Sequence, residues 1–294
     1  MQYTISYIFC TKNRLNFLKY NLEKLIQILR PEEEIVVVDG ESTDGTQAYL
    51  SNLFEAGKIH QYISEPDRAQ AHGWNKALLM ANGLIIKKII DDDIFDYTSI
   101  RKCAEYMIAN PKVDIVISND LTSRLTDYKT IYRNSHVSEF EKWAKKQIKS
   151  FWFGDIHTLI RKKSLAIFGL YNLEYVMMDW EYSLRISYLQ SNIVYYTGYN
   201  ALSVYHENSV SGQKNDKLIA QQTKKAIDFY DYQHPVSLWS KVKIAIGKMI
   251  FAKSKLNTEP NQLIDINSIY NTLQLEIEEI NRSGNYKFIS RDSY

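Results

Sequence analysis

Over the first 118 residues, short apolar runs alternate with longer stretches in which apolar residues recur every three or four positions. The short runs are rich in Ile and Val and are bounded by polar residues, a pattern typical of buried strands. Strands that alternate with helices favour an α/β fold with a mostly parallel central sheet. The predicted strands are 3–10, 34–39, 59–63, 84–90 and 113–118.

The stretches between these runs predict helices. The first covers 15–29, where leucine and isoleucine form a single apolar stripe that Pro31 ends. The other predicted helices are 43–56, 68–82 and 97–109, with Thr43, Asp67 and Thr98 as candidate N-caps.

After residue 118 the pattern is less regular. Further strands are predicted over 125–133, 155–161, 193–197 and 201–205, and helices over 138–148 and 179–190. From about residue 214 onward the pattern is helical throughout, in segments near 215–230, 238–253 and 261–281. A soft boundary near 212–236 divides the chain into a domain of residues 1–212 and a helical extension of residues 213–294.

Composition narrows the class of protein. Of 294 residues, 45% are hydrophobic and 24% charged, which is ordinary for a globular protein. A net charge of +2 gives no indication of a nucleic-acid partner. Cys10 and Cys103 lie in apolar contexts without metal or redox spacing, so we expect reduced thiols and a cytoplasmic protein. No apolar run approaches the ~20 residues that span a bilayer.

Polar residues follow three of the predicted strands. They occupy positions 11–14, 39–46 and 91–93. In open parallel sheets, ligands bind beyond the carboxyl ends of the strands, so we expect these segments to meet in one crevice. Segment 39–46 contains two glycines suited to a tight turn, but neither a GK[ST] ending nor a GxGxxG pattern is present. ATPase and dinucleotide-binding functions are therefore not favoured.

Asp91, Asp92 and Asp93 follow directly after the strand LIIKKII. Adjacent carboxylates raise one another's pKa values, and a divalent cation relieves that repulsion. Mg²⁺ and Mn²⁺ prefer oxygen ligands and complete their shells with water and substrate phosphate. The cluster therefore predicts a metal and phosphate site; an acidic cap at a helix N-terminus is the alternative.

Several ordered segments carry a family resemblance. They read ISYIFCTKNR, EIVVVDGESTDGT, SEPDRAQAHGWNKAL, LIIKKIIDDDIF and FGLYNLEYVMMDWEYSLRIS. Together, over residues 3–212, they resemble the family 2 glycosyltransferases, which have the GT-A fold. The resemblance implies an inverting, metal-dependent enzyme (Mn²⁺ or Mg²⁺) that transfers a sugar from a nucleotide-sugar.

The resemblance also implies a donor site. Asp39 would bind the base, commonly uracil, and Arg14 would lie near the phosphates. Asp91 would contact ribose, Asp93 would ligate the metal, and Asp92 would only tune the charge. The remaining residues implied to line the nucleotide site are Thr11, Asn13, Asp67, Arg68 and Asn75.

The segment MMDWEYSLR supplies the candidate catalytic base. An inverting transferase needs a carboxylate that removes the proton of the attacking hydroxyl. Asp179 is the better match and Glu181 the alternative; on a helix the two point in different directions, and Arg185 is placed to pair with Glu181. His157 and Trp180 are candidate contacts to the acceptor or donor sugar. His206 is a candidate metal or diphosphate ligand, with a hydrogen-bonded structural role as its alternative.

The helix predicted over 238–253 has an apolar face and, through residue 255, five lysines without an acidic residue. Two interpretations stay open: an interfacial helix on an anionic membrane, or a helix packed on its own domain. The last helix could pack beside it or mediate homo-oligomerisation.

The favoured function is transfer of a hexose or N-acetylhexosamine from a UDP-sugar to a saccharide or lipid-linked acceptor. Its expected setting is bacterial surface-polysaccharide biosynthesis at the inner face of the plasma membrane. One alternative is a sugar-nucleotide-binding protein without turnover. A nucleotidyltransferase is disfavoured because only Lys12 and Arg14 follow the first strand, where a basic, glycine-rich loop is needed.

Overall fold

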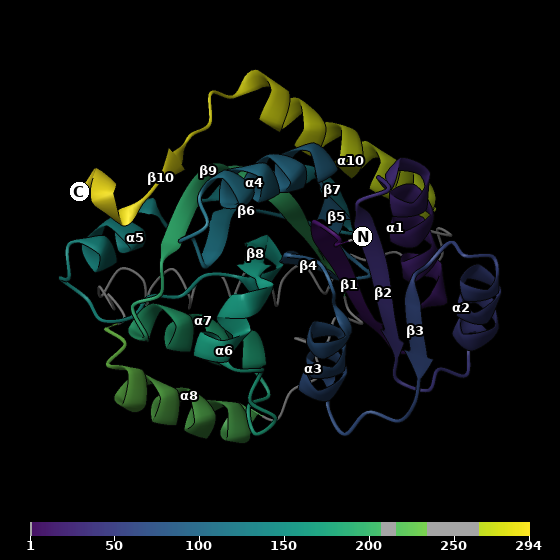
Figure 1. Cartoon of the computed structure of the whole chain (residues 1–294), viewed down its shortest axis with the longest axis horizontal. Coiled ribbons are helices and arrows are strands. Elements are labelled where there is room, and N and C mark those ends of the chain that lie inside the picture. Colours follow the sequence, from purple (N-terminus) through teal and green to yellow (C-terminus); the bar gives the residue numbers. More distant parts are fainter. Residues whose placement is uncertain (1, 207–215, 234–264) are drawn as a thin grey trace.

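The structure is a computed structural model that describes residues 2–206, 216–233 and 265–294. Its centre is one sheet with helices on both faces (Figure 1). The strands are β1 (Ile5–Thr11), β2 (Glu33–Asp39), β3 (Gln61–Ser64), β4 (Ile85–Ile89), β5 (Ile94–Phe95), β6 (Ile115–Arg124), β7 (Asp127–Asn134), β8 (Thr158–Arg161), β9 (Ile193–Tyr205) and β10 (Phe288–Ile289). The main helices are α1 (Leu15–Ile28), α2 (Thr46–Glu55), α3 (Gln70–Met80), α4 (Tyr97–Ala109), α5 (Val137–Ala144), α6 (Leu165–Phe168), α7 (Met178–Tyr188), α8 (Asp216–Tyr230) and α10 (Ile266–Ser283).

The strand order is β10-β9-β6-β8-β4-β1-β2-β3. From β3 through β1 to β4 all pairings are parallel, and β6 is parallel to β9. Between these two groups, β8 pairs antiparallel with both β4 and β6. The predicted α/β fold is therefore confirmed, but the sheet is mixed and not mostly parallel, since β8, β7, β5 and β10 pair antiparallel. The parallel part places the ends of β1, β2 and β4 at one edge.

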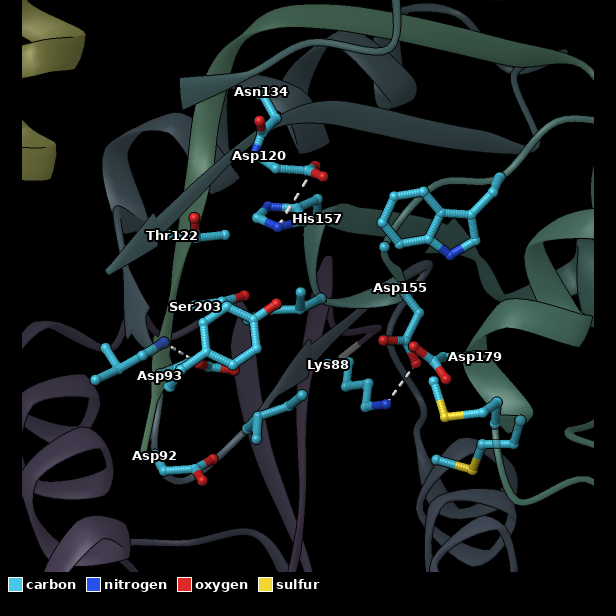
Figure 2. A pocket seen from close by; sticks show the side chains of 18 of the residues that line it. Lys88, Asp92, Asp93, Asp120, Thr122, Asn134, Asp155, His157, Asp179 and Ser203 are labelled. Atoms are coloured by element: carbon cyan, nitrogen blue, oxygen red, sulfur yellow. Dashed lines mark hydrogen bonds and ion pairs between the residues drawn. The ribbon is translucent and has the colours of Figure 1, made fainter. Parts of the chain in front are cut away.

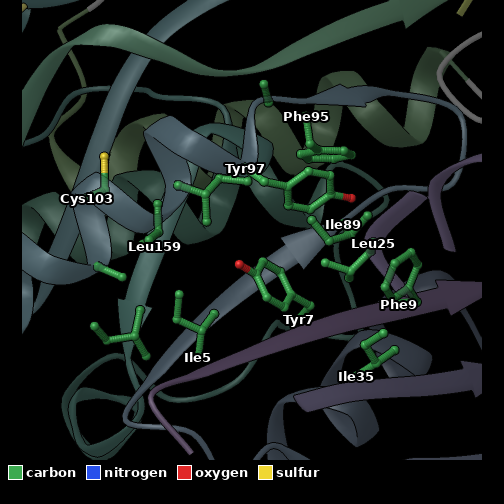
Figure 3. Packing of buried hydrophobic residues seen from close by; sticks show 14 of the residues in the cluster. Ile5, Tyr7, Phe9, Leu25, Ile35, Ile89, Phe95, Tyr97, Cys103 and Leu159 are labelled. Atoms are coloured by element: carbon green, nitrogen blue, oxygen red, sulfur yellow. The ribbon is translucent and has the colours of Figure 1, made fainter. Parts of the chain in front are cut away.

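Two apolar layers hold the sheet. On one face, Leu18, Leu22 and Leu25 of α1 and residues of α4 form one cluster with side chains of the sheet. Figure 3 shows Leu25, Tyr97 and Cys103 in this cluster. On the other face, α3 covers the alternate positions of β1 and β2, and residues of α5, α6 and α7 share a cluster with side chains of β6, β8 and β9. β1, β2 and β4 read as continuous apolar runs because both of their faces are buried.

The structure corrects several predicted boundaries. Segments 193–197 and 201–205 form the single strand β9, which passes Gly198 and Asn200 with a register shift against β6. Of the strand predicted over 155–161, Asp155–His157 form a 3₁₀ turn. The N-caps are Gly45, Ala69 and Asp96, not Thr43, Asp67 and Thr98.

The end of the chain packs on the sheet. α10 buries one face, including Ile269, Leu273 and Ile277, in a cluster with residues of β5 and β9. The expectation that everything after residue 214 is helical is wrong at β10, which pairs antiparallel with β9 through Phe288 and Tyr196. The predicted helix 238–253 lies outside the described residues. Within the described ranges, no helix combines the length and apolarity that a membrane span requires.

Candidate active site

The carboxyl ends of β1 and β4 bring two of the predicted segments together. The Thr11 hydroxyl donates to Oδ2 of Asp91 at 2.8 Å. The Arg14 guanidinium donates to Oδ1 of Asp91 at 3.1 Å and to Oδ2 of Asp92 at 2.5 Å. Segments 11–14 and 91–93 therefore meet in space, as the parallel sheet led us to expect.

The three aspartates have different electrostatic environments. Burial, and then the charge of Asp92, raise the pKa of Asp91 to about 7. The same two causes raise the pKa of Asp93 well above its usual range. Burial also acts to raise the pKa of Asp92, but hydrogen bonds and charges of His206 and Arg14 outweigh it and lower that pKa. Burial and mutual repulsion thus oppose the ionisation of Asp91 and Asp93, and a bound cation would favour it.

Hydrogen bonds from side chains to backbone carbonyl oxygens hold this turn. The Asn21 amide donates to the carbonyl oxygens of Asp91 at 3.0 Å and of Asp93 at 2.7 Å. The Tyr270 hydroxyl, from α10, donates to the carbonyl oxygen of Asp92 at 2.7 Å. α10 is therefore part of the support of the acidic turn.

The residues at this turn suit a divalent cation. Oδ1 of Asp93 accepts from the backbone N–H of Val204 at 2.8 Å, and the Asp93 side chain lines a pocket. Ionised carboxylate oxygens are the hard donors that Mg²⁺ and Mn²⁺ take, usually one or two from the protein. The part of the chain that is described contains no cluster of three or more His, Cys, Asp or Glu side chains that could hold a metal. Substrate phosphate and water would have to complete the shell.

His206 lies at the same cluster. Its Nε2 is 2.7 Å from Oδ2 of Asp92, and its ring stacks on Phe17 with centroids 5.0 Å apart. The structure thus gives His206 hydrogen-bonded and stacking partners beside the acidic turn.

Asp39 and Asn13 organise the turn after β2. The Asp39 carboxylate is buried and accepts from the Ser42 N–H at 3.0 Å, the Ser64 hydroxyl at 2.6 Å and the Ser42 hydroxyl. Asn13 has a φ of +53°, and its Oδ1 accepts from the Thr43 N–H at 2.7 Å. These bonds fix segment 39–46 against segment 11–14.

The predicted nucleotide-site residues in and before α3 have three different environments. Oδ1 of Asp67 pairs with Nζ of Lys76 at 2.9 Å, and a Cβ at Gly73 would lie 2.5 Å from Oδ2 of Asp67, so only glycine leaves room for this carboxylate. Arg68 is exposed. Asn75 uses both ends of its amide on the backbone of Tyr171, at 2.9 and 2.8 Å.

A pocket of about 660 Å³ connects the acidic turn to the predicted catalytic segment. Arg14, Asp92 and Asp93 line one part, and His157 and Asp179 line others (Figure 2). Trp180 is not among the lining residues; it packs edge-to-face with Tyr232, with ring centroids 5.9 Å apart.

Asp179 lies beside an ion pair that sequence reasoning missed. Nζ of Lys88 is 2.5 Å from Oδ2 of Asp155, which also accepts from the Tyr171 hydroxyl at 2.8 Å. Burial, and then the charge of Asp155, raise the pKa of Asp179, while Lys88 opposes them. A carboxylate with a raised pKa at a pocket is suited to accept a proton near neutral pH. The two lysines inside the apolar strand LIIKKII were the available sequence signal.

Glu181 faces away from this pocket. It is buried, its Oε2 pairs with Arg185 at 2.9 Å and its Oε1 accepts from the Tyr230 hydroxyl at 2.5 Å. The expected pairing of Arg185 with Glu181 is therefore present, and Glu181 is not among the pocket residues.

The sheet with helices on both faces is a GT-A type fold. The profile of "Glycosyl transferase family 2" matches residues 6–169, more than half of the chain, so the chain belongs to glycosyltransferase family 2. No curated protein matches it.

Two solved structures show the same fold. S. aureus TarS 1–349 in complex with UDP-GlcNAc is similar with a TM-score of 0.59 and 15% identity, over 95% of this chain and 81% of that chain. The mannosyltransferase PcManGT from Pyrobaculum calidifontis, in complex with GDP-Man and Mn²⁺, is similar with a TM-score of 0.53 and 15% identity, over 95% and 86%. At this identity the similarity establishes the GT-A fold alone.

Proposed function

We propose that this chain is an inverting, metal-dependent transferase that moves a hexose or N-acetylhexosamine from a UDP-sugar to a saccharide or lipid-linked acceptor. The observation that carries the proposal is that one pocket is lined both by the Arg14, Asp92 and Asp93 cluster and by Asp179. A carboxylate-rich turn for a metal and diphosphate and a separate proton acceptor are what such a displacement needs.

At the donor end, Asp93 would hold Mn²⁺ or Mg²⁺ together with oxygens of the sugar diphosphate. The bound metal supplies charge stabilisation for the departing nucleoside diphosphate. Arg14, whose guanidinium already lies on Asp91 and Asp92, would adjoin the same phosphates. Asp91 would face ribose, and His206 would adjoin the metal or diphosphate.

The base would lie against the turn after β2. Thr11, Asn13 and Asp39 stay its predicted contacts, with the further nucleotide-site residues Asp67, Arg68 and Asn75. A UDP donor is supported by the UDP-GlcNAc complex of TarS, and a GDP donor is the alternative that the GDP-Man complex of PcManGT suggests.

At the other end, Asp179 would take the proton of the acceptor hydroxyl. As that oxygen bonds to the anomeric carbon, the bond from this carbon to the diphosphate oxygen breaks on the opposite face, and the configuration inverts. His157 lines the pocket where a sugar would lie. For Trp180, the predicted sugar contact depends on a rearrangement, because its ring packs on Tyr232.

We place this activity in bacterial surface-polysaccharide assembly, in the cytoplasm at the inner face of the plasma membrane. The basic segment that would contact an anionic membrane, 238–255, lies outside the described residues. Co-sedimentation with anionic vesicles tests the contact: unchanged binding after deletion of residues 237–294 contradicts it. Gel filtration of the full chain and of the chain that lacks residues 237–294 tests homo-oligomerisation.

The function is tested by incubating the chain with UDP-glucose, UDP-galactose, their two N-acetylamino forms and GDP-mannose, each with Mn²⁺, Mg²⁺ or EDTA. We expect release of UDP from one donor, dependent on the metal. Nucleotide binding without release from any donor, with saccharide acceptors present, would indicate a binding protein. Release of pyrophosphate from UTP and a sugar 1-phosphate, with no nucleoside diphosphate released from any donor, would indicate a nucleotidyltransferase.

A further inference from the structure

The pocket contains a second group of polar side chains that the proposed transfer step does not use. Asp120 and Thr122 come from β6, Asn134 from the end of β7, and His136 and Trp152 from the segments around α5. Figure 2 shows Asp120, Thr122, Asn134 and His157 gathered in one part of the pocket, apart from Asp92 and Asp179. They form a distinct wall of the same cavity.

Asp120 is the centre of this wall and is only partly paired. It is 6% exposed, and its Oδ2 is 2.8 Å from Nε2 of His136. Its Oδ1 lies 3.5 Å from Nε2 of His157. Within the described residues, Oδ1 of Asp120 and Nδ1 of His157 have no hydrogen-bond partner, although both atoms are buried.

Two unpaired polar atoms on neighbouring buried side chains need an explanation, because buried polar groups in native proteins are almost always hydrogen-bonded. His157 is 3% exposed, so bulk solvent does not satisfy it. Both residues line the pocket, so this polar pair borders any molecule that binds there.

The surrounding side chains are held in place before any ligand arrives. The backbone N–H of His136 donates to the Tyr195 hydroxyl at 2.8 Å, and that hydroxyl donates to Oδ1 of Asn119 at 2.6 Å. The His136 ring meets Trp152 edge-to-face, with centroids 4.9 Å apart and planes at 89°. A carboxylate, two imidazoles and an indole are therefore fixed around one space, which lowers the ordering cost of binding.

The chemistry of these groups selects a class of ligand. The carboxylate accepts hydrogen bonds, and the Asn134 amide and the imidazoles can both donate and accept them. The indole offers apolar surface. Asp120 and Glu139 both line this part, which disfavours an anion. A neutral ring with several hydroxyl groups and an apolar face fits these requirements.

We propose that Asp120, His157 and Trp152 form a subsite for one pyranose ring, with His136 holding Asp120 and Trp152 in position. The inference rests on the proposed function, since the ring is either the sugar that the donor carries or the terminal sugar of the acceptor. The three residues then determine which sugar the enzyme accepts.

Two binding measurements distinguish the two sources. The first compares, by calorimetry with Mn²⁺, the affinity for UDP with that for each UDP-sugar. The second follows methyl α- and β-pyranosides of glucose, galactose and N-acetylglucosamine by saturation-transfer NMR, with and without UDP. The variants are Trp152→Ala and Asp120→Asn, and the controls are Tyr132→Ala and Asp127→Asn on exposed positions of β7.

We expect both pocket variants to lose at least about tenfold of sugar affinity, as truncation of a central binding residue does. Affinity for UDP itself should stay within about twofold, and the controls should match the unmodified chain. A loss in the first measurement identifies the donor sugar, and a loss confined to the second identifies the acceptor sugar. Asn has nearly the same size and shape as Asp, so the Asp120→Asn variant still tests the subsite if Trp152→Ala fails to fold.

Unchanged sugar affinity in both variants, or no binding of any sugar to the unmodified chain in either measurement, would overturn the subsite. Failure of the subsite and failure of the proposed function give different results. Sugar binding that depends on Asp120 and Trp152 without transfer refutes the transferase and keeps the subsite. Transfer that both variants retain with unchanged donor and acceptor KM refutes the subsite and keeps the transferase.

Discussion

Tyr270→Phe tests whether the last helix of the described structure supports the acidic turn. The substitution removes one oxygen and keeps the ring, which packs on Phe17 and Tyr20. What is lost is the hydrogen bond of 2.7 Å from the buried hydroxyl to the carbonyl oxygen of Asp92. Asn21 still donates to the carbonyl oxygens of Asp91 and Asp93 on either side.

The size of the effect follows from the burial of that bond. Leaving a buried carbonyl without its partner costs about 1–3 kcal/mol. For a chain of this size, each kcal/mol lowers the unfolding temperature by roughly 2–4 °C. We also expect the dissociation constant for UDP with Mn²⁺ to rise by about threefold to tenfold, since a looser turn must be ordered on binding.

Thermal unfolding and calorimetry measure both quantities. The matched control is Tyr20→Phe, which removes a bond between α1 and α10: the Tyr20 hydroxyl donates to Oδ1 of exposed Asn271 at 3.0 Å. An exposed bond of this kind should change stability by less than about 0.5 kcal/mol and leave UDP affinity unchanged. If Tyr270→Phe and Tyr20→Phe behave alike in both assays, the support assigned to α10 is refuted.

Four further substitutions test the proposed chemistry. Asp93→Ala should abolish the increase in UDP affinity that Mn²⁺ gives over EDTA, measured by calorimetry; a surviving increase would place the metal elsewhere. Asp179→Asn should reduce transfer by roughly 10²–10⁴-fold with UDP affinity nearly intact. Glu181→Gln disturbs the buried pair with Arg185 and should lower the unfolding temperature. Loss of transfer in Glu181→Gln with transfer retained in Asp179→Asn would make Glu181 the base. Asp155→Asn removes the charge that raises the pKa of Asp179. The base acts when ionised, so the acid limb of the pH–rate profile should move to lower pH, and a limb that stays or moves upward contradicts the assignment.

Local sequence pattern predicted much of the fold. Long apolar runs and helical stripes located β1, β2, β4, α1 and α4 because hydrophobic periodicity reports burial directly. The pattern failed where elements are short or irregular. β5 and β10 are two residues long and carry no period, and β9 continues through Gly198 and Asn200 because pairing with β6 holds it.

By itself the sequence determined the order of the long strands and helices over the first 118 residues, the acidic cluster after a buried strand and the motifs of the family. These follow from spacing along the chain, which folding does not change. Only the tertiary structure decided which carboxylate, Asp179 or Glu181, faces the pocket, and that Tyr270 supports the acidic turn.

It also brought Lys88, Asp155 and Asp179 together and placed Asp120 beside His157. The physical reason is that burial and charge depend on neighbours in space. These neighbours come from β4, β6, β8 with its preceding turn, and α7, and no local pattern records how such elements pack.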